Sequence, residues 1–439
     1  MTRLERDSLG ERDVPATVYW GIHTLRAGEN FPVTGVPVHP AWVRALAEVK
    51  LAAARANTDL GLLTPEAGHA LQAAAAEVAA GALADQFPVD ALQGGAGTSF
   101  NMNMNEVLAN RALELLGQPR GSYGTIHPID QVNRCQSTND TVPTALRIAA
   151  IRLVRGLAAE LANLQTALQA KETEFGGVAK LGRTEMQDAV PMTLGQEFGA
   201  WAEAVARDRW RMFKAEERLR QVNLGGTAIG TGVGAERGYS SRALEHLRRI
   251  TGLGLARAEN PVEATQNADL LVEVSGWLKA CAASLAKLAA DLRLLSSGPR
   301  GGLGEIRLPA LQAGSSIMPG KVNPVIPEML TQAAYQVMAS DLAITLGAQA
   351  GQLELNAFLP LMGDHLLRSL TTLTSAVRLL RERCIDGIAA DPERCRELLE
   401  RSTAGAAALV PKIGYDAATE IVKEVLGERM MTHGGNSRR

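Results

Sequence analysis

The stretch 314–324 holds the residue types best suited to chemistry on a small anion. It contains two adjacent hydroxyls, Ser315 and Ser316, followed by Lys321 and Asn323. The glycines and prolines around them exclude a regular helix or a central strand, so the stretch is predicted to be a loop. Glycine hinges, a cation and hydroxyls suit a lid that closes over an anion. The alternative is an ordinary exposed turn.

A glycine-rich stretch, 93–97, leads into Thr98 and Ser99 and then into a predicted helix. Backbone N–H groups at a helix start are free to bind an anion. The stretch does not match a phosphate-binding loop, because no Gly-Lys-Ser/Thr follows it and no strand pattern precedes it. The alternative is that Thr98 or Ser99 caps the helix.

Two further polar clusters lie at 137–140 and 182–188. The first, Ser-Thr-Asn-Asp, precedes a long predicted helix with Pro143 near its start, which is typical of a helix cap. It supplies more capping residues than one helix uses, so some of its side chains remain for a ligand. The second holds one arginine together with Thr184 and Glu185.

Several other kinds of site are excluded. The sequence has no HExxH or CxxC metal motif and no GxSxG elbow. The glycines of 223–240 do not form GxGxxG after a strand, which excludes a dinucleotide site. Neutral donors with one arginine and one lysine are what a small dicarboxylate or amino-dicarboxylate needs once water is excluded.

The elements that must present these clusters are predicted to be long helices. The chain has 439 residues, of which 46% are hydrophobic and only 4% aromatic, and this favours a mainly α fold. Leucines between Leu278 and Leu295 repeat in a heptad-like seam. Helices this long need partners along their length, so we predict a bundle completed by other subunits. The predicted long helices are 144–175, 193–222, 262–298, 328–359 and 361–391.

We divide the chain into an N-terminal domain (1–139), a central long-helix domain (140–392) and a small C-terminal helical domain (393–439). Residues 1–45 contain four prolines and should form an extended arm with short turns, and residues 432–439 should be disordered. The balance of 45 Lys+Arg against 47 Asp+Glu gives no basic field for nucleic acid. We see no signal peptide, no membrane span and no CxxC spacing, which predicts a cytoplasmic protein.

In combination, the four polar segments resemble the fumarase/aspartase superfamily, and the resemblance covers nearly the whole chain. The stretch 314–324 resembles its signature loop, and 97–103, 137–140 and 182–188 resemble its other conserved regions. Within the superfamily, these segments and the opening stretch 7–25 are similar to the aspartate ammonia-lyases. Fumarases typically carry Gln at the position of the first serine after Thr98 and a second Ser in place of the threonine of 137–140.

The resemblance implies a carbon–nitrogen lyase that reversibly removes ammonia from L-aspartate to give fumarate, without a covalent cofactor. It implies a three-domain, mainly α fold and a homotetramer with a core of twenty helices. Each active site would then be assembled from three subunits. Magnesium activates some relatives, but we find no ligand set for it in the sequence, so no metal site is predicted.

By family position, Ser315 is the base, used as an oxyanion, and removal of the Cβ proton passes through an aci-carboxylate. Serine becomes a usable base only when a closed loop supplies donors and a cation, for which Lys321 and backbone N–H groups are candidates. The substrate-binding residues that the resemblance implies are Thr98, Ser99, Ser137, Thr138, Asn139, Thr184, Glu185, Ser316 and Asn323. The residues expected to hold the β-carboxylate are Thr98, Ser137, Thr138 and Ser316. Those expected to hold the α-carboxylate are Lys321, Asn323 and Thr184. The amino group is expected to contact Asn139, with help from Thr98.

Two departures from the family pattern stand out. Glu185 occupies a position where the family usually has His or Gln, near the acid that matches Glu328. Two close carboxylates would raise one pKa and share a proton. Our hypothesis is that Glu185 attracts the substrate ammonium and disfavours a hydroxyl substrate; the alternative is that it points away. The second departure is the tail, because residues 417–439 are fewer than family members usually carry there.

Two alternatives to an aspartate-specific enzyme stay open. One is another lyase on the same scaffold, such as a fumarase or an enzyme for a related amino-dicarboxylate. The other is a non-catalytic helical protein that retained the fold, as in the lens proteins of the superfamily. The intact Ser315, Lys321, Asn323 and Asn139 speak against the non-catalytic alternative.

Overall fold

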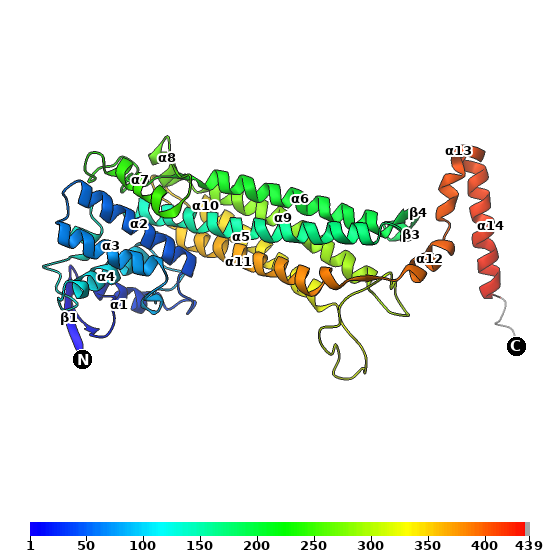
Figure 1. The fold of residues 1–439 in the computed structure, drawn as a ribbon, viewed down its shortest axis with the longest axis horizontal. Helices are drawn as coiled ribbons and strands as arrows, with labels where there is room; N and C mark the ends of the chain where they lie inside the picture. The colour runs from blue at the N-terminus through cyan, green and yellow to red at the C-terminus, as the bar shows by residue number, and fades with distance from the viewer. Residues whose placement is uncertain (435–439) are drawn as a thin grey trace. The chain divides into compact units, whose positions relative to one another are not determined.

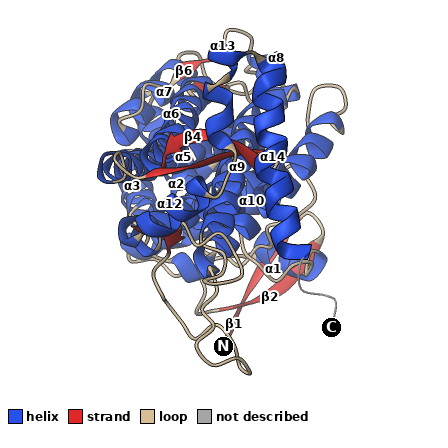
Figure 2. Ribbon diagram, turned by 90° about the vertical axis from the view of Figure 1, so that its right-hand side faces the viewer, coloured by secondary structure: helices blue, strands red, loops and turns tan. Residues whose placement is uncertain are grey.

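The structure is a computed structural model that describes residues 1–434, and side chains as far as residue 425. Helices dominate it (Figure 2, blue), and in the described residues the strands form four two-stranded sheets. This confirms the mainly α fold predicted from the sequence. No helix within residues 1–434 is both long and apolar enough to span a membrane.

The chain divides into two compact units. The first consists of Met1–Ala158, Trp210–Ala282 and Tyr335–Thr374. The second consists of Ala159–Arg209, Ala283–Ala334 and Ser375–Arg439. Five long helices contribute residues to both units, and all five are labelled in Figure 1. They are α5 (Thr138–Glu174), α6 (Leu194–Leu219), α9 (Asp269–Leu295), α10 (Val325–Gln349) and α11 (Leu359–Arg383).

These helices confirm the five predicted from the sequence, although four of their ends differ by more than five residues. The helix α5 begins at Thr138 and not at 144, and α11 ends at Arg383 and not at 391. The helix predicted over 262–298 is interrupted, because α8 (Pro261–Gln266) ends before α9 begins at Asp269. The sequence predicted a helix as far as residue 359, but α10 already ends at Gln349. The amide of Asn356 donates to the carbonyls of Gly347 and Ala348, both at 3.0 Å, and so takes up two acceptors that the helix end leaves open. Pro360 does not end a helix but lies in the first turn of α11, where its missing N–H costs nothing.

Apolar ridges along the helices form the core of each unit. The predicted seam of α9 is buried, and its leucines are at most 4% exposed: Leu278, Leu285, Leu288, Leu292 and Leu295. In α5, Leu157, Leu161, Leu164 and Leu168 are also fully buried. Leu153 has the spacing of the same face, four residues before Leu157, but it is half-buried, and Val154 is buried in its place. A straight helix drifts relative to a seven-residue repeat, which moves the buried position by one residue.

In the first unit, the central element is a helix rich in alanine, α2, which packs against α3, α4 and α7. Its alanines let neighbouring helices approach closely while the leucines between them fill the space. The remaining helices and strands of this unit are β1 (Thr2–Asp7), β2 (Gly10–Pro15), α1 (Ile22–Asn30), α2 (Pro40–Asp59), α3 (Pro65–Ala79), η1 (Ala84–Gln86), α4 (Thr98–Leu115), η2 (Pro128–Val132), β5 (Gln221–Val222), α7 (Tyr239–Thr251), β6 (Ala256–Arg257) and α8 (Pro261–Gln266).

The expectation that residues 1–45 form an irregular arm was wrong. They contain the β1–β2 hairpin, the helix α1 and the start of α2. The start of α1 is held from far along the chain, because the carboxylate of Glu106 accepts from the backbone of Gly21, His23 and Thr24 at 2.7–3.1 Å. The acceptor lies 82 to 85 residues further along the chain. The residues near α1 in the sequence therefore give little indication that a helix begins there.

The second unit contains a hairpin, β3–β4, that sequence reasoning missed (Figure 1). Its two central residues, Glu185 and Met186, are not residues that mark a hairpin turn, so no turn was predicted. The helix α12 packs against β3, and β7 pairs antiparallel with β8. The elements of this unit besides the long helices are β3 (Ala179–Thr184), β4 (Gln187–Thr193), β7 (Ile306–Arg307), η3 (Ile385–Gly387), β8 (Ala389–Ala390), α12 (Pro392–Glu400), η4 (Ala404–Ala408), α13 (Val410–Ile413) and α14 (Tyr415–Gly434).

The end of the chain differs in part from the prediction of disorder for residues 432–439. The helix α14 extends to Gly434, so residues 432–434 are helical. Residues 435–439 lie outside the described residues.

Candidate active site

The glycine-rich stretch ends at the start of α4 in the first unit. Gly97 is the N-cap, with a φ of 94° that favours glycine, and Thr98 is the first helical residue. The Thr98 hydroxyl donates to the Gly95 carbonyl at 2.7 Å, and the side chain of Gln93 accepts from the Phe100 N–H at 2.8 Å. The alternative that Thr98 or Ser99 caps this helix was therefore wrong. Gly97 occupies the N-cap position, and the side chain of Gln93 accepts from an N–H of the first turn.

The cluster 137–140 forms the start of α5, also in the first unit. The Ser137 hydroxyl accepts from the Asn139 N–H at 3.1 Å, and the Asp140 carboxylate accepts from the Ser137 N–H at 3.0 Å. This reciprocal arrangement is a capping box, so the helix-cap interpretation holds for Ser137. The other oxygen of Asp140 accepts from the backbone of Gly225 and Thr227 at 3.0 and 3.1 Å, which ties the helix start to the following glycine-rich segment.

A buried polar network joins the starts of α4 and α5. The amide of Asn101 donates both to Asn133 Oδ1 and to Thr138 Oγ1, each at 3.2 Å. Lys50 Nζ, also buried, donates to the same Asn133 oxygen at 2.9 Å. Burial lowers the pKa of Lys50 to about 7, and burial raises the pKa of Asp140 to about 6. The network fixes where the Thr138 hydroxyl sits.

Packing fixes the same two helix starts. The Trp42 ring meets Phe100 of α4 edge-on, with centroids 5.6 Å apart, and its indole N–H donates to the Val142 carbonyl of α5 at 3.1 Å. A Cβ on Gly363 of α11 would lie 2.4 Å from the same indole, so this position admits only glycine. Neither Trp42 nor the Lys50–Asn133 pair was predicted from the sequence. The asparagines at every second position from Asn101 to Asn105 were the feature of the sequence that could have indicated a buried polar network.

The stretch 314–324 is a loop in the second unit, as predicted. Its base is closed by two hydrogen bonds: the Gly314 N–H donates to the Lys321 carbonyl at 2.9 Å, and the Asn323 amide donates to the Gly314 carbonyl at 2.7 Å. The tip is open to solvent, with Ile317 82% exposed. A loop closed at its base and exposed at its tip can move as one piece.

Within this loop, the Ser315 hydroxyl oxygen accepts two backbone hydrogen bonds. The N–H groups of Ile317 and Met318 donate to Ser315 Oγ at 3.2 and 2.9 Å. Donors aimed at an oxygen favour its charged form. The loop therefore supplies Ser315 with donors of the kind that would stabilise an oxyanion.

Thr184 and Glu185 lie at the exposed tip of the β3–β4 hairpin, in the second unit. Glu185 and Met186 form the two-residue turn, with φ of 53° and 63°. Such a turn prefers Asn and Gly, and the left-handed conformation costs other residues on the order of 1–2 kcal/mol each. Strain of this kind clusters at functional sites. Glu328, which the family pattern pairs with this position, lies 3.7 Å from Arg293.

The predicted site residues thus fall into two groups within one chain. Those of the first unit are Thr98, Ser99, Ser137, Thr138 and Asn139. Those of the second unit are Thr184, Glu185, Ser315, Ser316, Lys321 and Asn323. The Asn101 bridge gathers the first group at two helix starts, whereas the second group is divided between a hairpin tip and a loop.

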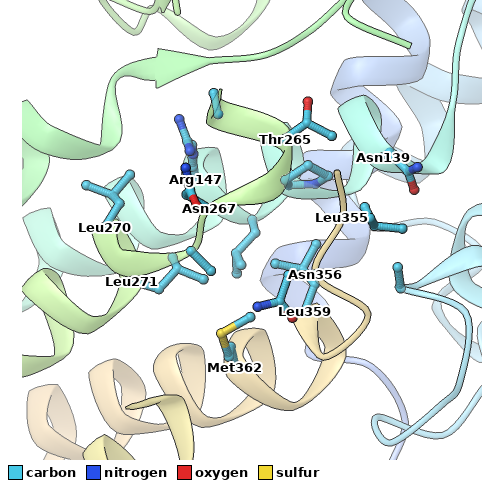
Figure 3. Close-up of a pocket in the computed structure, with 15 residues that line it drawn as sticks. Asn139, Arg147, Thr265, Asn267, Leu270, Leu271, Leu355, Asn356, Leu359 and Met362 are labelled. Atoms are coloured by element: carbon cyan, nitrogen blue, oxygen red, sulfur yellow. The ribbon is translucent and has the colours of Figure 1, made fainter. Parts of the chain in front are cut away.

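A pocket lies in the first unit, among α5, α8, α9 and the start of α11 (Figure 3). Of the predicted site residues, only Asn139 lines it. The walls are mainly apolar, with Leu271 and Met362 among them, and the one cation is Arg147, whose pKa burial lowers to about 10. An apolar cavity of this kind does not by itself suit a dicarboxylate. Asn323 lines a smaller pocket in the second unit.

No group of three His, Cys, Asp or Glu side chains within the described residues is arranged to hold a metal ion. The chemistry that the site residues offer on their own is hydrogen bonding to carboxylates together with proton transfer at a hydroxyl.

Residues 10–339 match the protein family described as "Lyase". The chain belongs to this lyase family. Among its relatives are the aspartate ammonia-lyases of a Bacillus species, 48% identical over 96% of this chain and 90% of the relative, and of Pseudomonas aeruginosa, 51% identical over 97% and 90%.

Solved structures of the family agree with the fold. The fumarate lyase:delta crystallin of Brucella melitensis bound to cobalt has a TM-score of 0.95 and 53% identity, covering 98% of this chain and 94% of that one. The recombinant class II fumarase of Schistosoma mansoni has a TM-score of 0.95 and 34% identity, covering 98% and 93%. The fumarase/aspartase-like fold expected from the four polar segments is therefore confirmed for this lyase.

Proposed function

We propose that the protein is an aspartate ammonia-lyase, a carbon–nitrogen lyase that reversibly converts L-aspartate to fumarate and ammonia. The observation that carries the proposal is the near-complete match to curated aspartate ammonia-lyases at 48–51% identity. The loop around Ser315 supports it chemically, because the reaction needs a base at the Cβ proton and the Ser315 oxygen already accepts two backbone N–H groups.

The reaction proceeds by anti elimination. The Ser315 oxyanion takes the Cβ proton, and the electron pair of the broken C–H bond moves into the neighbouring carboxylate to give an aci-carboxylate. That electron pair then returns to form the Cα–Cβ double bond, and the C–N bond breaks, so that ammonia leaves with the bonding pair. Lys321 adds positive charge near the base. Donors fixed before the reaction stabilise the extra charge on the carboxylate without reorganising.

The binding roles follow the groups of the substrate. Thr98, Ser137, Thr138 and Ser316 hold the β-carboxylate. The α-carboxylate is held by Thr184, Lys321 and Asn323. Asn139 contacts the amino group with help from Thr98, and Ser99, the second residue of α4, is a further substrate-binding residue. The buried link from Asn101 to Thr138 supports a fixed binding hydroxyl, as this proposal needs.

We extend the proposal to a homotetramer with a shared twenty-helix core, in which three subunits supply each active site. An exposed apolar stripe on α10 supports this, because Tyr335, Leu342 and Leu346 are 50–61% exposed and lie on one face at helical spacing. On α6, Trp210 and Phe213 are similarly exposed. Large exposed apolar side chains on helices are typical of subunit interfaces.

The proposal includes no cofactor and a small-molecule substrate, with magnesium activation left to measurement. It keeps the three-domain division at residues 139/140 and 392/393. A cytoplasmic location is consistent with Cys135, Cys384 and Cys395, which are buried free thiols.

The direct test is to add L-aspartate to the purified protein and follow the ultraviolet absorbance of fumarate. The proposal requires absorbance to rise, ammonia to be released in equal amount, and the reverse reaction to proceed from fumarate and ammonium. No turnover of L-aspartate by a folded oligomer would refute it. Turnover of L-malate instead would favour a fumarase, and turnover of neither substrate would favour the non-catalytic alternative.

A second candidate is a fumarase, to which the class II fumarase match gives weight. Glu185 discriminates between the two, because a carboxylate at the exposed hairpin tip attracts an ammonium and not a neutral hydroxyl. We expect kcat/KM for L-malate to be far below that for L-aspartate, and Glu185→Gln to narrow the difference. Equal activity on both substrates in the wild-type protein would remove this role for Glu185.

A further inference from the structure

The β3–β4 hairpin has a strained tip and therefore needs support at its base. Glu185 and Met186 both lie in the left-handed region, and neither is a glycine or an asparagine. Such a conformation persists only where the surrounding structure determines it. Because Thr184 and Glu185 are at this tip, whatever holds the base of the hairpin also sets the place of two proposed substrate-binding residues.

The base is held by one buried carboxylate, that of Glu305. Arg183 Nη1 donates to both of its oxygens at 2.9 and 3.1 Å, and Lys180 Nζ lies 3.1 Å from Oε2. Lys180 also donates to Glu197 at 2.6 Å. Glu305 is 0% and Lys180 1% exposed, so these charges are stable only as a matched set of two cations and two anions.

A bulge in the strand lets one carboxylate reach both cations. Lys180 and Arg183 are three residues apart, and in a regular strand they would point to opposite faces. The register shifts between Leu181 and Arg183, which reverses the alternation and brings both cations to Glu305. Gly182 permits the bulge, because a Cβ there would lie 2.7 Å from the Val190 carbonyl.

Glu305 is itself fixed on both sides of its backbone. Its N–H donates to the carbonyl of Leu295, the last residue of α9, at 2.9 Å. Its carbonyl accepts from the N–H of Asp391, the N-cap of α12, at 2.9 Å and from the Cys395 thiol at 3.6 Å. The backbone of Glu305 is thus fixed by hydrogen bonds to the end of α9 and the start of α12. It lies nine residues before the loop that carries Ser315.

We propose that Glu305 is a positioning residue of the reaction. Through Arg183 and Lys180 it holds the β3–β4 hairpin so that Thr184 and Glu185 meet the substrate. It contacts no substrate itself. The inference rests on the proposed function, because it assumes that Thr184 and Glu185 bind L-aspartate.

The first test compares two isosteric charge removals in the full-length oligomer, Glu305→Gln and Glu216→Gln. Glu216 is the matched control, since it is also a buried carboxylate and pairs with two arginines, Arg155 and Arg220. We expect both variants to lose thermal stability. Only Glu305→Gln should raise the KM for L-aspartate, about tenfold, with a smaller change in kcat, because a displaced hairpin weakens substrate binding. A destabilised Glu305→Gln variant with wild-type KM and kcat would overturn the proposal.

A milder variant guards against misfolding of Glu305→Gln. Arg183→Lys keeps the buried charge balance but cannot span both oxygens of Glu305 in the same way, so it should fold and still raise the KM severalfold. Combining it with Thr184→Ala gives the decisive readout. If Arg183 acts through the tip, its effect on the KM shrinks once the Thr184 hydroxyl is gone. Additive effects would count against the proposal.

The failure of this inference is distinguishable from the failure of the proposed function. A wild-type protein that does not convert L-aspartate refutes the function. Wild-type activity together with kinetics unchanged in both Glu305→Gln and Arg183→Lys refutes only the positioning role.

Discussion

The start of α5 and the loop at 314–324 both carry hydroxyls proposed to act on the same substrate, yet they are built in opposite ways. Thr138 is tied to Asn101, which is 2% exposed, and through it to Asn133 and Lys50. The Ser315 loop makes its hydrogen bonds within itself, and its tip residue Ile317 is 82% exposed.

The difference corresponds to two demands on one reaction. A group that binds the substrate carboxylate gains from being fixed in advance, because no reorganisation is then needed as charge develops. A group that takes the proton must be covered when the substrate is bound and open when it leaves, which requires a mobile loop. The first group is therefore held by tertiary contacts and the second by its own backbone.

The largest effect is expected from Ser315→Ala. If the loop supplies the base, kcat should fall on the order of 10³-fold, while the melting temperature stays unchanged because the loop is exposed. Fumarate absorbance and thermal denaturation measure the two quantities. Ile317→Ala, which keeps the backbone N–H donor to Ser315 and changes only an exposed side chain, is the control and should reduce kcat much less. Full activity in Ser315→Ala would end the assignment of the base.

The closure of the loop base can be broken separately. A Cβ on Gly314 would lie 2.4 Å from the Lys321 carbonyl and 2.7 Å from the Asn323 N–H, so Gly314→Ala must open the base. We expect kcat to fall on the order of 100-fold with little change in stability. Gly320→Ala is the matched control, because it has a φ of 78° but no neighbour within 4 Å. The Gly320→Ala variant should lower kcat by less than about tenfold. If the two variants lost kcat equally, the loss would come from backbone strain and not from opening the base of the loop.

The fixed region should respond in binding more than in turnover. Asn101→Ala removes the bridge between Asn133 and Thr138, and we expect the KM for L-aspartate to rise about tenfold with kcat lowered less. Steady-state kinetics give the split. A change confined to kcat would show that Thr138 acts in the chemical step and would weaken the contrast between the two regions.

The smallest effect concerns how stability depends on pH. Burial lowers the pKa of Lys50 from 10.5 to about 7. The folded protein therefore disfavours the charged lysine, so this residue's contribution to stability is lost as the pH falls from 10.5 through 7. In Lys50→Met the slope of unfolding free energy against pH in that window should flatten. Urea unfolding at several pH values measures it, with the half-exposed Lys279→Met as control. An unchanged slope would contradict the lowered pKa of the buried Lys50.

Much of the fold was readable from local pattern. Leucine spacing predicted the long helices at 144–175 and 262–298, because a helix that buries one face must repeat apolar residues along it. Runs free of proline predicted the other three. Neither pattern could place the end of α10, since Asn356 terminates that helix from the following loop. The hairpin tip at Glu185 carried no turn residue and could not be foreseen from propensity.

The sequence by itself determined the family and the identity of the chemical groups, because four motifs with their hydroxyls, amides, lysine and base are local strings of residues. Only the tertiary structure decided which of these groups are fixed in position and which residues fix them. Asn101 meets Asn133 across 32 residues and Arg183 meets Glu305 across 122, and no local pattern encodes such pairs. They exist because buried polar and charged groups must find partners once the helices have packed, wherever along the chain those partners lie.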